Sequence, residues 1–374
     1  MNVPKLRFKE FNEEWKNNKI EELFKLSSGT TPATTEKNNY VGDINWISSG
    51  ELKPKYINRT MNCISKKTSQ SMKIYPKGTL LIALYGLEAE GVRGTASILN
   101  IESTISQACM AFEPLNNNIT NEFMYYWYKN NGEWIGRKIA QGTKQQNLTS
   151  ELIKPLIINY PHIEEQNKIS NTLQLLDKKI ELQAKKIEDL KLFKKGLSTT
   201  LFNSLNNYSE LKLGNICNIT TGKLDANAME DNGKYRFYTC AKNYSLINEY
   251  AFDTEALLIS GNGAYVGYIH YYKGKFNAYQ RTYVLDNFKE NIQYIKCYLD
   301  EYLSKRINSE KKEGNTPYIV LSTLSDMKIK IPNIFEQNKI SKIINNYNKK
   351  IILEENKLLK LNELKKGLMQ NMFV

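Results

Sequence analysis

Two stretches of this sequence repeat each other at a fixed distance. Residues 165–170 read Glu-Gln-Asn-Lys-Ile-Ser, and residues 336–341, 171 positions later, read the same. The same offset matches Lys178-Lys179-Ile180 with Lys349-Lys350-Ile351, and Lys194-Lys195-Gly196-Leu197 with Lys365-Lys366-Gly367-Leu368. One register held over about 40 residues indicates an internal duplication, so we expect the chain to fold as two copies of one unit.

Each repeated stretch has the period of a long helix. Apolar residues recur in alternating steps of four and three, which is the a/d pattern of a coiled coil. They are Ile169, Leu173, Leu176, Ile180, Ile187, Leu190, Leu197 and Leu201 in the first copy, and Ile340, Ile344, Tyr347, Ile351, Leu358, Leu361, Leu368 and Met372 in the second. A helix of about 38 residues would span roughly 57 Å. Because a helix that long is not stable alone in water, each seam must bury against a partner, for which the other copy is the obvious choice.

The regions ahead of the two helices also correspond, with residues 20–29 aligning with residues 213–222 at an offset of 193. Continuous apolar runs at residues 77–84 and 255–260 predict buried strands, and residues 266–272 predict a strand that enters a turn at Lys273-Gly274. The sequence therefore predicts an α+β fold with a pseudo-two-fold repeat. Its parts are a mixed α/β domain at 1–160, a long helix and linker at 161–206, a second domain at 207–331 and a second long helix at 332–374.

The charge balance favours a polyanionic partner. Lys and Arg number 52 against 39 Asp and Glu, which gives a formal net charge of +13. Such an excess suits DNA, because Lys and Arg neutralise phosphates, although a basic surface can also serve solubility. No apolar run approaches the roughly 20 residues of a membrane span. The first residues also lack the apolar region of a secretory signal, so we expect a cytoplasmic protein.

Metal and cofactor motifs are missing. The five cysteines lie far apart and the only histidines are His162 and His270, whereas the ligands of a zinc site must cluster. Residues 261–267 differ from a dinucleotide-binding loop because the third glycine comes one residue late, and no P-loop sequence occurs. We therefore expect this chain to bind no metal and no cofactor.

Catalytic patterns are weak as well. Asp43, Glu51 and Lys53 have the spacing of a magnesium-dependent nuclease, but the E-x-K pattern occurs six times in this chain. The two histidines lie in different copies and form no base–nucleophile pair. The runs Asn-Pro-Pro-Tyr and Asp-Pro-Pro-Tyr, expected of an amino-methylating site, are not present. Any chemistry on DNA would therefore have to come from a partner.

Polar loops that carry glycine are the best candidates for reading DNA, because Asn and Gln pair with adenine while Arg and Lys pair with guanine. In the first domain the candidate contacts are Ser28, Thr30, Thr31, Lys53, Tyr85, Arg93, Lys144, Gln145 and Gln146. In the second domain they are Thr221, Lys223, Asn262, Tyr265, Gln280, Arg281 and Asn315. The alternative for each tyrosine is ordinary half-buried sheet surface.

Together with the duplication, several motifs resemble the specificity subunit of type I restriction-modification systems over essentially the whole chain. They are the Glu-Gln-x-Lys-Ile helices at 165–169 and 336–340, the Ser-Gly-Thr-Thr-Pro turn at 28–32, Pro-Lys-Gly-Thr-Leu-Leu-Ile at 76–82 and Gly-Lys-Phe-Asn-Ala-Tyr-Gln-Arg-Thr-Tyr-Val at 274–284. In the second copy the turn reads Thr221-Gly222-Lys223-Leu224-Asp225, which leaves its local role there open.

The resemblance implies two target-recognition domains held apart by two antiparallel helices, with each domain reading one half of a bipartite, gapped site in double-stranded DNA. It also implies that two modification subunits, which bind S-adenosylmethionine and methylate adenine N6, dock on the chain, and that two ATP-driven restriction subunits join them. S-adenosylmethionine, ATP and magnesium would then sit on the partners, and this chain would be non-catalytic. Two alternatives remain: a coiled-coil scaffold without DNA affinity, and a stand-alone nuclease that needs Mg²⁺.

Polar residues interrupt both seams at matching positions, Gln183 and Lys194 in the first helix and Glu354 and Lys365 in the second. Polar seam residues of this kind fix the register of paired helices. If the helices run antiparallel about a two-fold axis, the seam predicts that Lys194 faces Glu354 and that Gln183 faces Lys365, with the axis near residues 188–189. The alternative is that all four side chains face solvent or a partner subunit.

Overall fold

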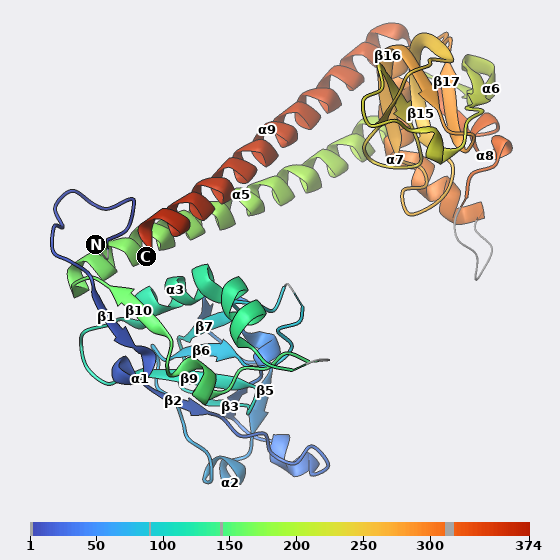
Figure 1. Cartoon of the computed structure of the whole chain (residues 1–374). Helices are drawn as coiled ribbons and strands as arrows, with labels where there is room; N and C mark the ends of the chain where they lie inside the picture. Colours follow the sequence, from blue (N-terminus) through green and yellow to red (C-terminus); the bar gives the residue numbers. More distant parts are fainter. Residues whose placement is uncertain (1–2, 90, 143–144, 311–317) are drawn as a thin grey trace. The chain divides into compact units, whose positions relative to one another are not determined.

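The computed structural model describes residues 3–89, 91–142, 145–310 and 318–374. It divides into two compact units, of which the first comprises Met1–Leu182 and Leu358–Val374 and the second Gln183–Lys357 (Figure 1). Each unit holds one globular domain of mixed α/β structure together with a part of each long helix.

The first unit is built on a five-stranded sheet in the order β2-β9-β6-β7-β4, in which only β7 and β4 are parallel. A three-stranded sheet, β5-β3-β8, and the pair β1-β10 accompany it. The strands are β1 (Lys16–Lys19), β2 (Phe24–Ser28), β3 (Ile44–Ile47), β4 (Tyr56–Ile57), β5 (Asn62–Ile64), β6 (Leu80–Ala83), β7 (Ala96–Leu99), β8 (Thr104–Ile105), β9 (Cys109–Pro114) and β10 (Ile157–Tyr160). The helices are α1 (Ile20–Leu23), α2 (Lys66–Ser69), α3 (Asn121–Trp134) and α4 (Ser150–Ile153). Two 3₁₀ turns, η1 (Lys37–Tyr40) and η2 (Ser49–Glu51), and a π-helical segment after α3, η3 (Ile135–Ile139), complete the domain.

The five-stranded sheet is buried on both faces, which explains the continuous apolar run of β6. Leu80 and Ile82 face the core that includes α3, whereas Leu81 and Ala83 face a second core on the other side. That second core includes residues of the three-stranded sheet, among them Ile47. Because successive residues of a strand point to opposite faces, burial on both sides requires apolar residues at every position.

The second unit has the same central strand order with one added edge strand, β12-β17-β15-β16-β13-β14. Again the pair β13 and β16 is parallel, and the other neighbours are antiparallel. The strands are β11 (Ser209–Lys212), which pairs with β18 (Lys328–Ile331), β12 (Asn218–Thr221), β13 (Tyr235–Tyr238), β14 (Ser245–Ile247), β15 (Phe252–Ser260), β16 (Ile269–Ala278) and β17 (Thr282–Asp286). The helices are α6 (Leu213–Ile216), α7 (Ile292–Glu310) and α8 (Leu321–Ser325), with a short turn η4 (Ala226–Ala228).

The predicted turn at Lys273-Gly274 is wrong, because both residues lie inside β16. Cross-strand pairing with Glu255 and Thr254 carries the strand through this point. Gly274 takes a φ of +128° there, a backbone conformation open to glycine at little cost, so the glycine marks an irregularity within a strand and not its end.

The two repeated stretches form single long helices, α5 (Ile163–Asn203) and α9 (Ile334–Met372). Every predicted seam position is buried or half-buried. In the first unit the domain core includes Ile169 and Leu173 from the start of α5 and Met372 from the end of α9. In the second unit the roles are exchanged, because Ile340 at the start of α9 and Phe202 at the end of α5 share one core. Each domain is thus packed against both helices. Among the described residues, no helix has a stretch long and apolar enough to cross a membrane.

Gln183 and Glu354 pair with each other, so the predicted register, in which Lys194 faces Glu354, is wrong. The side-chain amide of Gln183 donates to the Glu354 carboxylate at 2.7 Å and to its main-chain oxygen at 3.0 Å. Lys186 and Lys357 each reach the same carboxylate at 3.0 Å. Hydrogen bonds from Gln183 and the two lysines lower the pKa of Glu354 to about 2. Long polar side chains, and not an apolar core, cover this carboxylate.

Lys194 and Lys365 bind residues beside the seam, so the predicted partner of Lys365, Gln183, is also wrong. In the second unit Lys194 Nζ donates to Asn348 Oδ1 at 3.0 Å. In the first unit Lys365 Nζ lies 2.5 Å from a carboxylate oxygen of Asp177. The prediction failed because Glu354 meets Gln183, which lies about 16 Å from Lys194 along α5, so the two helices have a different axial register. In this register the long lysine side chains reach the flank of the neighbouring helix.

Candidate nucleic-acid interface

The candidate loops of the first unit gather at one end of its five-stranded sheet. By the pairing of the strands, β2 and β6 end there and β9, β7 and β4 begin there. Ser28 at the end of β2 and Tyr85 just after β6 therefore lie at this end. Arg93 precedes β7 and Lys53 precedes β4, which places them at the same end. The sheet thus collects loops that are far apart in the sequence.

The turn after β2 approaches the chain after β8 closely. The Thr30 N–H donates to the Ile105 carbonyl at 2.9 Å, and the Thr31 hydroxyl accepts from the Gln107 N–H at 3.3 Å. A Cβ added to Gly29 would lie 1.9 Å from the Ile105 oxygen, so this position needs glycine. Thr30 is exposed and Thr31 half-buried. The turn therefore presents one hydroxyl to solvent and uses the other to hold its shape.

Arg93 is engaged inside the protein, which changes its predicted role. Its Nε donates to the Leu87 carbonyl at 2.8 Å and its Nη2 to the Glu88 carbonyl at 2.7 Å. Its Nη1 donates to the Glu133 carboxylate at 2.8 Å. Because all three nitrogens have partners, Arg93 holds the loop after β6 against α3, which carries Glu133, and has little capacity left to bind a base.

Gln145 and Gln146 lie next to that loop. The Gln146 N–H donates to the Glu88 carboxylate at 3.0 Å, and the Leu87 N–H donates to the Gln146 carbonyl at 3.0 Å. Gln145 is exposed, and Tyr85 exposes 38% of its surface. The candidate Lys144 lies outside the described residues. Two glutamines and one tyrosine thus form a polar surface around a loop that Arg93 holds in place.

Glu51, the candidate metal ligand of the nuclease alternative, is used in hydrogen bonds inside the protein. Glu51 is 8% exposed, and its carboxylate accepts from the Ser48 N–H at 3.1 Å, the Thr60 hydroxyl at 2.9 Å and the Met61 N–H at 2.8 Å. These bonds use Glu51 to close a turn, while Lys53 is exposed. In the part of the chain that the structure describes, no three His, Cys, Asp or Glu side chains are grouped to hold a metal.

The second unit brings three segments of the candidate surface, together with Tyr318 and Ile319, to one small cleft. The Gly261 N–H donates to the Arg281 carbonyl at 2.9 Å, and Gly222 passes so close to Ala278 that a Cβ would lie 1.8 Å from the Ala278 oxygen. Gly222 therefore has the role of Gly29 in the first unit, although the residues after it differ. The cleft has a volume of about 120 Å³ and is lined by Thr221, Gly261, Gln280, Arg281, Tyr283, Tyr318 and Ile319.

Lys223, Asn262 and Tyr265 surround this region, exposed except for the half-buried Asn262, whereas Asn315 lies outside the described residues. The loop at 239–244, which was not among the predicted contacts, also lies at the cleft. Its Cys240 thiol donates to the Arg281 carbonyl at 3.3 Å, which places the loop against the cleft. This loop contains Lys242 and Tyr244 but no glycine, so it lacks the feature on which the predicted loops were chosen.

The repeated glutamines attach each domain to a long helix. Gln166 is fully buried, and its amide nitrogen donates to the carbonyls of Asn118 at 2.7 Å and Pro161 at 2.9 Å. Its amide oxygen accepts from the Thr120 N–H, at the cap of α3, at 3.0 Å. The motif therefore joins the start of α5 to the start of α3.

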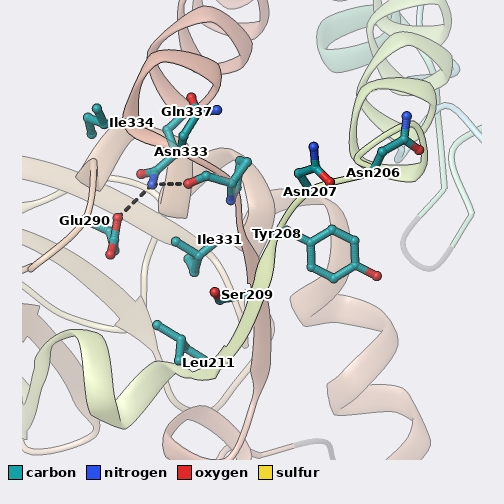
Figure 2. Close-up of a pocket in the computed structure, with 11 residues that line it drawn as sticks. Asn206, Asn207, Tyr208, Ser209, Leu211, Glu290, Ile331, Asn333, Ile334 and Gln337 are labelled. Atoms are coloured by element: carbon teal, nitrogen blue, oxygen red, sulfur yellow. Dashed lines mark hydrogen bonds between the residues drawn. The ribbon is translucent and has the colours of Figure 1, made fainter.

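Gln337 does the same in the second unit, at the wall of an open pocket of about 690 Å³ (Figure 2). Its nitrogen donates to the Glu290 carboxylate at 2.7 Å and to the Pro332 carbonyl at 2.9 Å. Its oxygen accepts from the N–H of Asn291, ahead of α7, at 3.0 Å. The repetition of this contact explains why the glutamine recurs in both copies.

A polar network adds a second attachment in the first unit. Lys55 Nζ donates to the Tyr126 hydroxyl at 3.2 Å and to the Gln174 amide oxygen at 3.3 Å. Tyr126 donates in turn to the Asp177 carboxylate at 2.8 Å, which also binds Lys365. Burial lowers the pKa of Lys55 to about 8. The network therefore links the loop before β4, α3, α5 and α9.

Comparison with known proteins agrees with this architecture. The profile of the type I restriction modification DNA specificity domain matches residues 12–192 and again residues 206–363. The EcoDI type I restriction enzyme specificity subunit of Escherichia coli is 39% identical over 134 residues, which is 36% of this chain and only 30% of that subunit. The MjaIX type I restriction enzyme specificity subunit of Methanocaldococcus jannaschii is 25% identical over 407 aligned positions, covering 95% of this chain and 92% of that subunit.

Solved structures share the fold. The S subunit of a type I restriction-modification system from M. genitalium superposes with a TM-score of 0.68 at 21% identity, over 100% of this chain and 99% of that one. A chain from a structure of the assembly and conformational transition of the type I restriction-modification system gives 0.61 at 14% identity, over 97% and 98%. Since two copies of the family domain cover most of the sequence, the chain belongs to the DNA specificity subunits of type I restriction-modification systems.

Proposed function

We propose that each unit reads one half of a bipartite, gapped site in double-stranded DNA, and that the two long helices set the spacing between the halves. The observation that supports this proposal is that the two domains share one strand order but differ in their loops. Both domains use one sheet topology, yet the residues that line the candidate surfaces differ. Two readers on one scaffold can recognise unrelated half-sites, so the site need not be palindromic.

We also propose that the helices pack about a pseudo-two-fold axis near Gln183 and Glu354. These two residues are 171 positions apart, the offset of the repeat, and they contact each other. The equivalent contacts of Lys194 with Asn348 and of Lys365 with Asp177 support the same axis. One chain would then imitate the symmetry of a DNA-binding dimer, with the coiled-coil seam as its centre.

The chemistry is proposed to lie on partner subunits. Two modification subunits would dock on this chain and methylate adenine with S-adenosylmethionine, and two restriction subunits would add ATP-driven cleavage. This chain would bind none of these cofactors and would act in the cytoplasm. The scaffold alternative explains neither the basic charge of +13 nor the polar loops collected at one end of the sheet.

The test is a gel shift on mixed genomic DNA, with and without the modification subunit, together with methylome sequencing of a host that carries the complex. We expect salt-dependent DNA binding by the assembled complex and a methylated motif with two defined halves around an unread gap. The purified chain with S-adenosylmethionine alone should methylate nothing, and with Mg²⁺ alone should cleave nothing. A complex that binds all DNA equally at every salt concentration would contradict the proposal.

A further inference from the structure

The guanidinium of Arg236, on β13 of the second unit, is held by tyrosines. Its Cζ lies 4.4 Å from the ring centroids of both Tyr244 and Tyr272. Its Nη1 donates to the Tyr238 hydroxyl at 3.3 Å. Among the described residues no ring contact joins Tyr244 to Tyr272, so the two rings meet the guanidinium from different directions. The side chain is therefore oriented without the help of a carboxylate.

Arg236 is continuous with the candidate surface of the second unit. The loop at 239–244, which carries Tyr244, is fixed by three contacts. The Cys240 thiol donates to the Arg281 carbonyl, an imidazole nitrogen of His270 lies 2.9 Å from the Ala241 carbonyl oxygen, and Lys242 Nζ lies 5.3 Å from the Tyr265 ring centroid. This loop thus meets the cleft residue Arg281 on one side and Arg236 on the other.

The positive charge of Arg236 is not neutralised inside the protein. The ion pairs formed by the described residues do not include it, and its one hydrogen bond goes to a neutral hydroxyl. Arg236 is half-buried, whereas Tyr244 exposes 46% of its surface, so the site opens to solvent. An oriented, unpaired guanidinium at the surface is suited to a ligand with two acceptors in one plane.

Base reading fits this geometry better than phosphate binding. A phosphate contact needs only a positive charge, and the exposed Lys242 and Lys273 already supply such charges nearby. Guanine presents O6 and N7 in the plane of the base, which matches the fork of an arginine. We propose that Arg236 reads a guanine in the half-site of the second unit. This inference rests on the proposed function and names one of its specificity-determining residues.

The test uses the full chain assembled with its modification subunits, and selects from duplex DNA with randomised positions. Arg236→Lys keeps the charge and removes the fork, so we expect the preference for guanine at one position of one half-site to fall about 5–150-fold. The other half-site and the gap should stay unchanged. Lys275→Gln is the matched control, because Lys275 lies on β16, the strand next to β13, and contacts a single ring, that of Tyr250. Its motif should equal that of the wild type.

Tyr244→Leu provides a second variant outside the strand, in case Arg236→Lys disturbs folding. It should weaken the preference at the same position by loosening the guanidinium. An unchanged motif in a folded Arg236→Lys complex would overturn the inference. So would a uniform loss of affinity with a smaller salt dependence, which indicates a phosphate contact. A wild-type complex without any bipartite motif would overturn the proposed function itself, and the inference with it.

Discussion

Replacing the buried Gln166 by leucine should detach the first domain from α5. The change keeps most of the volume but removes the partners of three polar groups. Asn118 is exposed, so water can replace the bond to its carbonyl, whereas Pro161 is buried and Thr120 half-buried. A buried polar group left without a partner costs about 1–3 kcal/mol. Water can partly reach the Thr120 N–H but not the Pro161 carbonyl, so the two groups together should lower the local free energy of unfolding by about 3 kcal/mol.

The measurement is hydrogen exchange followed by mass spectrometry on peptides from α3 and the start of α5. A global unfolding midpoint is less informative, because a chain with two units need not unfold in one step. A local loss of about 3 kcal/mol speeds exchange by roughly 100-fold. Asn167→Leu is the matched control, since Asn167 is the exposed neighbour of Gln166 on the same turn. Exchange within threefold of wild type in Gln166→Leu would refute the reasoning.

Three further predictions concern the pH dependence of stability and the recognition of the two DNA half-sites. Burial lowers the pKa of Lys55 from 10.5 to about 8, so between these pH values the unfolded chain binds more protons than the folded chain. The stability of the wild type, measured by its urea midpoint, should therefore rise with pH in this range. Lys55→Met should lose this rise, while the exposed Lys53→Met should keep it. Because the pKa of Glu354 is lowered to about 2, its contribution to stability is complete above pH about 4.5 and is lost as the pH falls through about 2. The thermal midpoint of Glu354→Gln should therefore depend less on pH in this range than that of the wild type. The same pH dependence in both proteins would argue against the contact between Gln183 and Glu354. Gln146→Ala should relax only one half-site and Asn262→Ala only the other, by about 1–3 kcal/mol per lost contact in DNA selection, and equal changes in both halves would contradict independent reading.

Local features of this protein could be read from the sequence because they depend on period and spacing. The 171-residue repeat, the two helical seams and the buried run of β6 are properties of neighbours along the chain. Burial on one stripe of a helix, or on both faces of a strand, leaves a pattern of apolar residues that does not depend on the partner. The motif with Gln166 could also be found by repetition, although not its contacts.

Only the tertiary structure decided which polar groups meet. Asn348 and Glu354 lie six residues apart, or about 9 Å along α9, so which of them Lys194 binds depends on the axial register of the two helices and on the reach of a flexible side chain, and neither leaves a trace in periodicity. The same holds for Arg93, whose guanidinium is consumed by carbonyls from its own loop. It holds also for Arg236, whose tyrosine partners come from a loop and a strand that lie apart in the sequence. Hydrogen bonds and stacking act over short distances, so the folded backbone must first bring these groups together before their roles are determined.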